Sequence, residues 1–348
     1  MSHREKSVSV IVVNWNRREL LRACLESLAA QTIADFEVIV VDNGSEDGSA
    51  DMAEKEFGGA GRLDVQVIRN RENRGFCAAN NQGIEAARSP LIALLNNDAE
   101  ADRGWLASLA GALARWPGAG MAASKILVWG DPGRIDKVGH LIYLDGQNRG
   151  RGCGQADNGQ FDREEEVLWP DGCAAMYRRE MIERIGGFDE DFFAYADDAE
   201  LGLRARIAGW TCVYVPSAVV RHHLGSTLGR VSPRRLQLIE RNRILLVAKL
   251  FPWSLVWLSV PFYLARLAGG AAAAVSGEGE AARFPGWKGK LSVATALVKA
   301  HLEAIPLLPR MLRKRAEVNR IRHLTPRQVR ALLLRYRIPL AEISRQAT

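Results

Sequence analysis

Two carboxylates separated by one residue stand out in the segment LLNNDAEADRGWL. Asp98 and Glu100 follow directly after the apolar run 91–96. Paired oxygen ligands at the end of a buried strand suit a hard divalent cation, and a cation bound there could hold a diphosphate. The alternative is a simple turn in which Asp98 caps a helix that begins near Trp105.

A second acidic cluster, Asp197-Asp198-Ala199-Glu200, opens a segment of helical spacing in which Arg204 stands four residues after Glu200. Three carboxylates in four residues repel one another, and the helix dipole offsets only about 0.3 to 1 kcal/mol of that repulsion. The cluster therefore indicates a bound cation or a reacting proton. A general base here would contribute roughly 10² to 10⁴ in rate. A plain capping cluster is the alternative.

Two further groups of residues have polar side chains that suit ligand binding. His222 and His223 follow a β-branched run and precede Gly225-Ser226-Thr227, so either histidine could complete a metal site or contact a phosphate. In the segments 73–76 and 80–83, Gly75 permits close backbone approach and the asparagine amides can read a base or a sugar.

The elements that must position these residues form a βαβ pattern from residue 8 to residue 98. The strand candidates are VSVIVVN (8–14), FEVIVVD (36–42), VQVIR (65–69) and LIALLN (91–96). Between the first two, apolar residues from 20 to 28 recur with helical spacing. Because whole strands are apolar, we expect a parallel sheet that is covered on both faces.

The predicted strands end on polar residues, namely Asn14, Asp42-Asn43, Asn70 and Asn97-Asp98. Ligands of open α/β sheets bind at the carboxyl ends of the strands, so these side chains describe a site. A GxGxxG motif does not follow the first strand, which disfavours a nicotinamide-dependent dehydrogenase. From 130 to 166 the sequence loosens into Gly, Asp, Asn and Arg, which predicts a flexible loop facing an acceptor or a disordered excursion.

The chain changes character after residue 232. Residues 1–227 carry 25 basic and 34 acidic side chains, a net charge of −9, whereas residues 228–348 carry 22 and 6, a net charge of +16. The uncharged run 250–265 is interrupted by Pro252 and Pro261, and it is shorter than the ~20 residues that span a bilayer. Its tryptophans favour a segment that lies in the membrane interface, although 250–275 could span if Arg266 were tolerated.

The last section contains a basic amphipathic stretch, with cations at Arg310, Arg313, Lys314, Arg315, Arg320 and Arg322. Anionic lipid head groups are the expected partner, with a solvated helical face as the alternative. Nucleic acid is not expected, because no RNA-recognition, helix-turn-helix or zinc pattern accompanies the charge. The five scattered cysteines predict a reducing compartment, and the N-terminus does not read as a cleaved leader.

Six motifs occur in order: VVNWN, VVDNGSEDGS, NRGFCAANNQGI, LLNNDAE, GGFDEDFFAYADDAELGLRARIAGW and HHLGST. Together they resemble the family 2 glycosyltransferases, most closely the rhamnosyltransferase-like branch that builds bacterial surface polysaccharides. The resemblance covers residues 7–227. It implies an α/β fold in which a GT-A (Rossmann-like) nucleotide-diphospho-sugar transferase domain occupies residues 1–230. A basic, mainly helical, membrane-associating extension would follow over residues 231–348.

The resemblance assigns roles to particular residues. The donor-binding residues would be Asn14, Asp42, Asn43, Asn73, Gly75 and Asn97. Among them, Asp42 would be the carboxylate near the nucleotide base. The candidates for contacts with the acceptor would be Asp197, Glu200, Trp169 and Asp171.

By the same resemblance, Asp98 and Glu100 stand at the family's DxD and would hold Mg²⁺ or Mn²⁺ on the diphosphate. His222 matches the downstream metal or phosphate histidine, although His223 makes the register uncertain. Asp198 would be the catalytic base. Two departures matter. The family usually writes Glu-Asp where this chain has Asp197-Asp198, and Glu100 is one methylene longer than the usual aspartate.

The implied activity is an inverting transfer from a dTDP- or UDP-linked sugar to a glycan or a lipid-linked acceptor, on the inner face of the plasma membrane. Two alternatives remain at this point. A catalytically silent sugar-nucleotide-binding scaffold would be expected to lack one of the carboxylates. A nucleotidyltransferase would need a glycine-rich basic loop after the first strand, where this chain reads NWNRREL. The basic tail could also mediate homodimerisation instead of membrane contact.

Overall fold

The computed structural model describes residues 6–58, 63–224, 232–276, 283–284 and 286–345. Contacts divide the chain into two compact units. The first contains residues 1–139, 150–205 and 210–224, and the second contains residues 140–149, 206–209 and 225–348. The helical unit therefore includes two short segments, 140–149 and 206–209, that the sequence placed in the domain of residues 1–230.

The first unit is built on one large mixed sheet. Its strands run in the order β10-β12-β6-β11-β4-β1-β2-β3, with β5 paired to β12 and β7 to β6. Their bounds are β1 Val8–Asn14, β2 Phe36–Asp42, β3 Val65–Arg69, β4 Leu91–Leu95, β5 Ala99–Ala101, β6 Ala119–Val128, β7 Asp131–Lys137, β10 Glu165–Val167, β11 Ala174–Arg178 and β12 Thr211–His222.

The four strands from β1 to β4 are parallel, as the βαβ pattern predicts, and their positions agree with the sequence to within one residue. Beyond β4 the sheet becomes mixed, because β11 runs antiparallel to both β4 and β6. Strand β12 pairs with β6 in parallel, but its register shifts between Val215 and Val219, so that three residues on β12 have no counterpart on β6.

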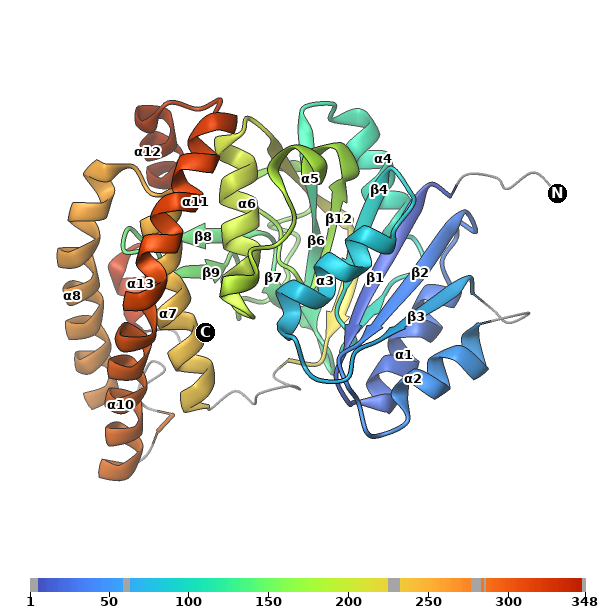
Figure 1. Cartoon of the computed structure of the whole chain (residues 1–348), viewed down its shortest axis with the longest axis horizontal. Coiled ribbons are helices and arrows are strands. Elements are labelled where there is room, and N and C mark those ends of the chain that lie inside the picture. The colour runs from blue at the N-terminus through green and yellow to red at the C-terminus, as the bar shows by residue number, and fades with distance from the viewer. Residues whose placement is uncertain (1–5, 59–62, 225–231, 277–282, 285, 346–348) are drawn as a thin grey trace. The chain divides into compact units, whose positions relative to one another are not determined.

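Helices cover both faces of this sheet (Figure 1). Helices α1 (Arg18–Ala29), α2 (Ser49–Met52) and α4 (Trp105–Arg115) contribute to one core cluster, in which Leu25, Met52 and Trp105 are buried against the valines of β1 and β2. Helix α3 (Gly75–Ala86) lies on the opposite face. A Cβ on Gly83 would come within 2.5 Å of Ile11, so this glycine permits close packing of α3 on β1.

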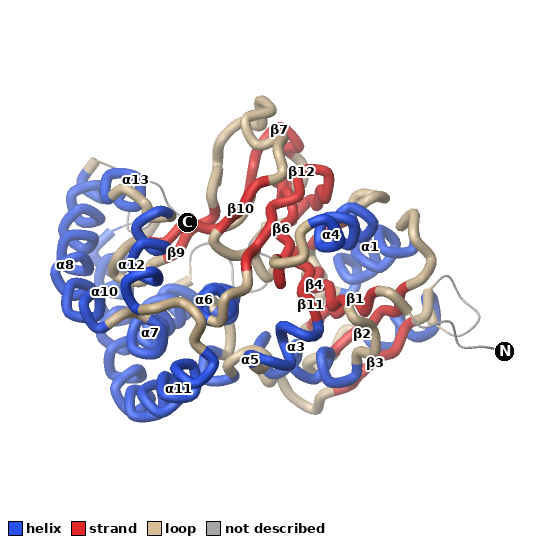
Figure 2. The backbone as a smooth tube through the Cα atoms, turned by 90° about the horizontal axis from the view of Figure 1, so that it is seen from above, coloured by secondary structure: helices blue, strands red, loops and turns tan. Residues whose placement is uncertain are grey.

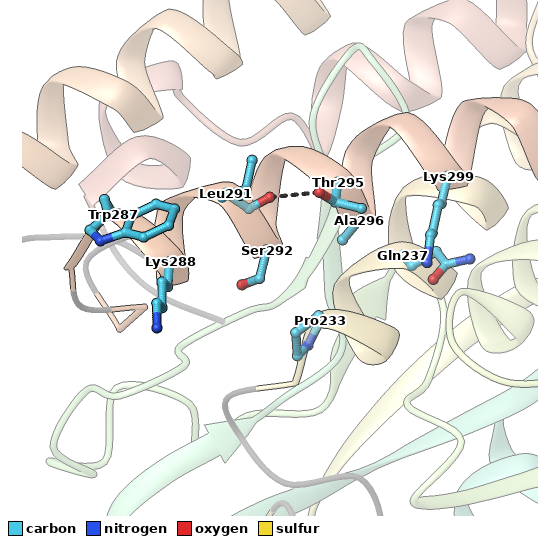
Figure 3. Close-up of a pocket in the computed structure, with 9 residues that line it drawn as sticks. All are labelled: Pro233, Gln237, Trp287, Lys288, Leu291, Ser292, Thr295, Ala296 and Lys299. Atoms are coloured by element: carbon cyan, nitrogen blue, oxygen red, sulfur yellow. Dashed lines mark hydrogen bonds between the residues drawn. The ribbon is translucent and has the colours of Figure 1, made fainter.

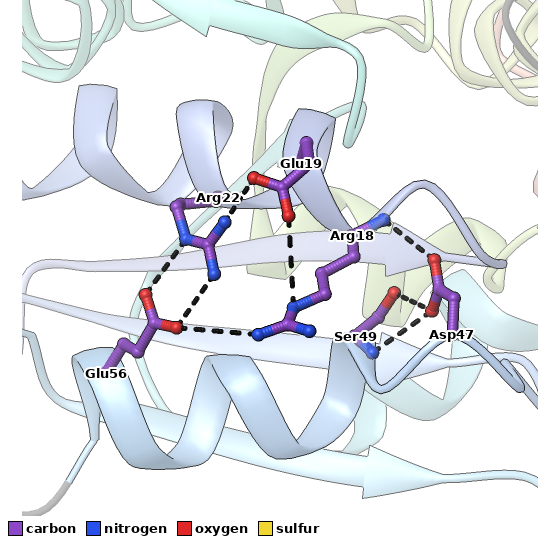
Figure 4. Close-up of polar contacts among 6 residues, drawn as sticks. All are labelled: Arg18, Glu19, Arg22, Asp47, Ser49 and Glu56. Carbon is purple, nitrogen blue, oxygen red and sulfur yellow. Dashed lines mark hydrogen bonds and ion pairs between the residues drawn. The ribbon is translucent and has the colours of Figure 1, made fainter.

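Ion pairs at the surface join α1 to the segment after β2 (Figure 4). The guanidinium of Arg22 binds Glu56 at 2.8 Å, and the backbone N–H of Arg18 donates to Asp47. Asp47 thus caps the first turn of α1 and fixes the loop that follows Asp42. Hydrogen bonds from Ser49 and Arg18 outweigh the effect of partial burial and lower the pKa of Asp47.

The structure contradicts the prediction of a flexible loop over 130–166. This region forms β7, β8 (His140–Ile142), β9 (Asn148–Gly150) and β10, separated by turns and, before β10, by the longer connection 151–164. Its glycines at 130, 139, 146, 152, 154 and 159 all have positive φ. A composition that reads as disorder therefore reflects a series of turns that only glycine adopts without strain.

The second unit is almost entirely helical (Figure 2). Its helices are α7 Pro233–Leu250, α8 Trp253–Val275, α10 Gly286–Ala304, α11 Leu308–Ile321, α12 Pro326–Arg335 and α13 Leu340–Arg345. Ser232 caps α7, and a capping box formed by Thr325 and Gln328 begins α12. Pro261 lies inside α8, so the predicted interruption there does not end the helix.

Candidate active site

Three of the predicted donor-binding residues form one hydrogen-bonded group at the carboxyl ends of neighbouring parallel strands. The side-chain amide of Asn14 donates to Asp42 at 3.0 Å, and Asn97 donates to the Asn14 oxygen at 2.7 Å. Asp42 also accepts from the backbone N–H of Ser45 at 3.0 Å. Asn14 and Asp42 are buried, so they hold the strand ends and the turn after β2 in one arrangement.

A second polar network surrounds the start of α3. Asn43 donates to Asn73 at 3.3 Å and to the Gly75 carbonyl at 3.1 Å, and Asn70 donates to Asn43 at 2.8 Å. Gln82 exchanges hydrogen bonds with Asn70. Asn43, Asn70 and Asn73 therefore lie together, as the sequence predicted. Hydrogen bonds to one another hold them there.

Gly75 has φ +84°, and a Cβ added there would come within 2.5 Å of the Phe193 ring. The backbone N–H of Cys77 also donates to the Phe193 carbonyl at 3.1 Å. This close approach explains the glycine. Phe193 itself was missed from the sequence, because it is separated from Gly75 by more than a hundred residues and belongs to no motif of spaced polar residues.

The segment 80–83, which the sequence also proposed for base or sugar contacts, is used within the protein. Asn80 donates to the Phe76 carbonyl, and Asn81 donates to the Phe188 carbonyl at 2.9 Å. The first bond lies within α3, and the second ties α3 to the chain ahead of the acidic cluster at 197–200.

His222 lies between two buried carboxylates. Its Nδ1 atom is 2.9 Å from Asp136, and its Nε2 atom is 3.4 Å from Oδ1 of Asp98. Burial lowers the pKa of His222, but the interactions with Cys173, Asp136 and Asp98 outweigh it and raise this pKa well above its ordinary value. Neither Asp136 nor the surrounding GRIDKVGH was selected from the sequence, because this stretch was interpreted as a loop.

The neighbouring histidine makes a separate pair. His223 Nε2 lies 2.8 Å from Glu100, and its ring stacks on Trp129 with centroids 4.3 Å apart. Strand pairing explains both contacts. Strand β5 runs antiparallel to β12 with Arg221 opposite Glu100, so His223 lies diagonally across from Glu100. Strand β6 pairs with β12 with Val128 opposite His222, so Trp129 lies beside His223. The two histidines therefore each face one carboxylate of the Asp98-x-Glu100 motif.

The atoms present at Asp98 and His222 fit a divalent cation. Two ligand atoms 3.4 Å apart can both lie about 2.1 Å from one ion, and an oxygen together with an imidazole nitrogen suits Mn²⁺. Both side chains are buried, so little reorganisation is needed. To become a third ligand, the Glu100 carboxylate would have to give up its contact with His223 or bind the cation through its other oxygen.

The acidic cluster begins α6 (Asp197–Ile207), as predicted. Asp197 and Glu200 are buried, whereas Asp198 is half-buried. Burial and the neighbouring charge of Asp198 raise the pKa of Asp197 well above its ordinary value. Glu200 forms a buried ion pair with Arg204 at 2.8 Å. Asp198 accepts from the backbone N–H of Ala199 at 2.7 Å, and Gly172 N lies 3.4 Å from its other oxygen.

The backbone just before α6 is strained. Phe193, Tyr195 and Ala196 all have φ between 55° and 70°, a region that costs side-chain-bearing residues of order 1 kcal/mol or more each. The bonds from Cys77 to Phe193 and from Glu200 to the Ala196 carbonyl hold this segment in place. Strain of this kind is typical of binding and catalytic segments.

Two further residues predicted for acceptor contacts occupy different environments. Trp169 is fully buried, and a Cβ on Gly202 would touch its ring, so it packs beneath α6. Asp171 binds Lys137 at 2.9 Å and accepts from the backbone N–H of Cys173. Burial lowers the pKa of Lys137, but Asp136 and Asp171 outweigh it, so this pKa lies well above its ordinary value and the side chain remains charged.

Residues 9–186 match the family model for glycosyl transferase family 2, and residues 160–274 match the model for glycosyl transferase family group 2. The chain belongs to the family 2 glycosyltransferases. The resemblance seen in its motifs is thereby confirmed, including the rhamnosyltransferase-like branch, since one relative is named a rhamnosyltransferase.

Relatives of this glycosyltransferase occur among bacterial proteins of glycan synthesis. An N-acetylglucosaminyl-diphospho-decaprenol L-rhamnosyltransferase of Mycobacterium tuberculosis is 29% identical over 248 residues, 64% of this chain and 77% of that protein. The O-antigen biosynthesis protein RfbC of Myxococcus xanthus is 29% identical over 226 residues, 62% of this chain and 17% of that protein. The match to the uncharacterized protein y4gI of Sinorhizobium fredii spans only 25% of that relative.

Solved structures confirm the GT-A fold of the glycosyltransferase. A mannosyltransferase of Pyrobaculum calidifontis in complex with GDP-Man and Mn²⁺ superposes with a TM-score of 0.54 and 20% identity, covering 92% of this chain and 86% of that one. GalNAc-T7 with UDP, GalNAc and Mn²⁺ gives a TM-score of 0.58 and 13% identity, covering 90% and 55% of the two chains.

Proposed function

We propose that this transferase moves a sugar from a nucleoside-diphosphate donor to a hydroxyl of a glycan or lipid-linked acceptor, with inversion at the anomeric carbon and with a divalent cation on the diphosphate. The observation that carries the proposal is the placement of Asp98, between β4 and β5, and His222, the last residue of β12, with two ligand atoms 3.4 Å apart. The half-buried Asp198 at the start of α6 supplies the carboxylate that the reaction needs.

Asp198 is our choice for the base because its two acidic neighbours are less suited to accept a proton. Glu200 is paired with Arg204, and Asp197 has a raised pKa that favours its neutral form. Asp198 is only half-buried and accepts a hydrogen bond from the backbone N–H of Ala199, which orients its carboxylate.

In the proposed step, Asp198 takes the proton of the acceptor hydroxyl while that oxygen attacks the anomeric carbon from the face opposite the diphosphate. The new carbon–oxygen bond forms as the bond to the β-phosphate oxygen breaks, and the nucleoside diphosphate leaves with both electrons. A cation at Asp98, Glu100 and His222 would neutralise the charge on this leaving group. The six predicted donor-binding residues, which include Asn14, Asp42 and Asn97, would line the nucleotide side.

The donor and acceptor classes follow from relatives and remain part of the proposal. The mycobacterial relative is named for rhamnose transfer to a decaprenol-linked sugar, which favours a dTDP- or UDP-linked sugar, rhamnose included, and a lipid-linked acceptor for this chain. The retained carboxylates and the family assignment favour an active enzyme over the silent scaffold or a nucleotidyltransferase. A lipid-linked acceptor would place the enzyme on the inner face of the plasma membrane.

Two helical stretches of the second unit are long and apolar enough to cross a membrane, by length and composition alone. They are Trp253–Ala274 and Gly286–Ile321, and only 11% and 17% of their most apolar windows are buried. Arg266 bears on whether α8 lies on a membrane surface or crosses the bilayer. It binds Asp145 at 2.6 Å and Glu240 at 2.7 Å, so one face of α8 is joined to the rest of this unit by buried charges.

The opposite face of α8 is apolar and exposed. Trp253, Trp257, Val260 and Leu264 recur at helical spacing with exposures between 53% and 76%. The continuous helix from α10 into α11 presents a similar stripe through Trp287, Leu291, Val298, Leu302, Ile305 and Leu312. The rings of Tyr263 and His301, 5.5 Å apart, join these two helices.

Cations flank the second stripe. A groove of about 520 Å³ between α7 and α10 is lined by Trp287, Lys288, Leu291 and Lys299, among others (Figure 3). Arg310 and Arg313 are exposed on α11, but Arg315 is not available, because it is buried and donates to the Phe251 carbonyl at 2.6 Å. The prediction that Arg315 faces lipid is therefore wrong. We propose that the remaining cations and the exposed tryptophans bind an anionic bilayer surface.

Calorimetry tests the donor site. UDP, dTDP and GDP are titrated into the protein with Mn²⁺ and then with EDTA. Metal-dependent binding of one nucleotide is expected, and the corresponding sugar donor is then tested for transfer to a polyprenyl-diphosphate-linked sugar. Binding that is absent for all three nucleotides would overturn the proposal.

Vesicle sedimentation tests the membrane surface separately. The full chain is expected to bind vesicles that contain phosphatidylglycerol more tightly than neutral ones. The double variant Trp257→Ser and Trp287→Ser should reduce this binding at least tenfold, whereas Trp129→Ser, at an exposed tryptophan of the first unit, should not. Equal binding to both kinds of vesicle, or a concentration-dependent dimer that buries Trp257, would overturn the assignment to anionic lipid.

A further inference from the structure

Asp136 is a buried carboxylate on β7 that none of the roles above employs. One of its oxygens lies 2.9 Å from Nδ1 of His222 and 3.7 Å from the ammonium of Lys137. Only 4% of the residue is exposed, and its partner His222 is 8% exposed. Lys137 is in turn held by Asp171 at 2.9 Å. Burying a charged group costs desolvation free energy, so the groups that contact Asp136 indicate its role.

An imidazole can ligate a cation through one nitrogen only if that nitrogen carries a lone pair, and in the neutral ring the proton then sits on the other nitrogen. An ionised carboxylate accepts hydrogen bonds and donates none. Asp136 opposite Nδ1 therefore keeps a proton on Nδ1. A cation that displaces the other ring proton would bind the lone pair of Nε2, the atom that faces Asp98.

We propose that Asp136 is a positioning residue that fixes the tautomer and the ring orientation of His222, so that Nε2 and Asp98 bind one divalent cation together. The inference deepens the proposed function, because it rests on the metal site at Asp98 and His222. Lys137 belongs to the same arrangement, since its salt bridges with Asp136 and Asp171 hold the carboxylate in place. The arrangement also resolves which histidine is the ligand.

His223 contacts different groups. Its Nε2 atom faces Glu100 at 2.8 Å, and its ring is stacked on Trp129. The Asp136 carboxylate contacts the ring of His222 instead. The inference therefore assigns ligation to His222 and a separate contact with Glu100 to His223.

Mn²⁺ binding to the full-length protein provides the test, because it can be measured without turnover. The free Mn²⁺ signal in electron paramagnetic resonance gives the dissociation constant, with the metal alone and with UDP or dTDP added. Pulsed measurements report the coupling of Mn²⁺ to the imidazole nitrogen. Loss of an outer carboxylate that orients a ligating histidine typically weakens metal binding about 10- to 100-fold.

Asp136→Ala should therefore weaken Mn²⁺ binding by roughly 10- to 100-fold and diminish the nitrogen coupling, and His222→Ala should abolish the coupling. Asp136→Asn keeps the shape of the side chain and one acceptor oxygen. Its Mn²⁺ affinity should lie between those of the wild type and Asp136→Ala, and its fold should be more stable than that of Asp136→Ala. The matched control is Asp131→Ala, an exposed aspartate of the same strand that pairs with Arg134, and it should leave both readouts unchanged.

Each outcome bears on the inference. Unchanged affinity and coupling in both Asp136 variants would overturn it while leaving the metal site and the proposed transfer intact. Nitrogen coupling that survives His222→Ala and disappears in His223→Ala would also overturn it. A wild-type protein that binds Mn²⁺ neither alone nor with nucleotide would remove the metal from the proposed function, and the role of Asp136 with it.

Discussion

Glu200 and Arg204 form a buried, two-pronged ion pair within α6, in which both carboxylate oxygens lie 2.8 Å from guanidinium nitrogens. Arg204 also donates to the backbone carbonyls of Gly186 and Gly187, at 2.9 Å and 2.6 Å. The pair therefore joins α6 to the turn at 185–187. Glu200 holds the helix on which the proposed base stands.

Glu200→Ala should accordingly destabilise the protein by about 3 to 5 kcal/mol, because it leaves the Arg204 guanidinium buried without its carboxylate. Chemical denaturation measures the loss. Replacement of the exposed Glu183 on the neighbouring helix α5 (Arg179–Ile185) by alanine is the control and should change stability by less than about 0.5 kcal/mol. A Glu200→Ala protein of wild-type stability would contradict the structural role.

Asp198→Asn should reduce activity and leave stability largely unchanged, unlike Glu200→Ala. We expect a fall in kcat of about 10² to 10⁴ with donor affinity unchanged, because the amide cannot accept the hydroxyl proton but fills the same space. Single-turnover kinetics and nucleotide calorimetry separate the two effects. Retention of full transfer activity would move the base elsewhere, with Asp197 the next residue to test.

Asp197→Asn should raise stability at high pH. The folded chain holds a proton on Asp197 that the unfolded chain releases near pH 4, because burial and Asp198 raise the pKa of Asp197. Wild-type stability is therefore expected to fall as pH rises from about 4 through that raised pKa. The variant lacks this dependence, so the gain in melting temperature should be larger at pH 8 than at pH 5. A gain that is the same at both values would disagree with the assignment, and Asp131→Asn is the control.

Gly75→Ala should destabilise the protein by at least about 1 kcal/mol, because the position has φ +84° and the new Cβ would meet the Phe193 ring. The double variant with Phe193→Ala separates the two causes. It should recover the steric part of the loss while the backbone part remains, a coupling that a double-mutant cycle measures. Strictly additive effects would show that the ring moves aside without cost.

Arg266→Leu should loosen α8 although leucine is more apolar, because Asp145 and Glu240 would remain buried without that partner. A loss of about 3 to 5 kcal/mol is expected. Hydrogen exchange reports it locally, as faster exchange of the amides of α8. Arg313→Leu, at an exposed position of α11, should leave that exchange unchanged. If α8 instead crosses a bilayer independently of its neighbours, Arg266→Leu should strengthen membrane association.

The sequence was informative where physical constraints are local. Strands β1 to β3 agree with their predicted bounds because runs rich in β-branched residues favour strands, and in β1 and β2 almost the whole run is buried. The acidic cluster that starts at Asp197 begins α6, as its spacing indicated. The sequence was misleading at 130–166, where glycine-rich turns between short strands share their composition with flexible loops.

The partners of the site could not be predicted in the same way. Asp136 reaches His222 across 86 positions of sequence, and Phe193 reaches Gly75 across more than a hundred. Such pairs depend on how β7, β12 and the segment before α6 are placed by the sheet, which no local spacing encodes. Arg315 was misassigned for a related reason, because only the packing of α11 shows that its guanidinium is inside.

The irregularity in β12 has a consequence for which histidine faces the carboxylates. Before it, the odd-numbered Val213 and Val215 belong to the core cluster, and from Ala218, the last of the three additional residues, the even-numbered Ala218 and Val220 do so. An odd number of additional residues inverts the in–out alternation of a strand. His222 therefore shares the side of Val220. Without the three additional residues 216–218, His223 would lie on that side of the strand. The insertion therefore determines that His222, and not His223, faces Asp98.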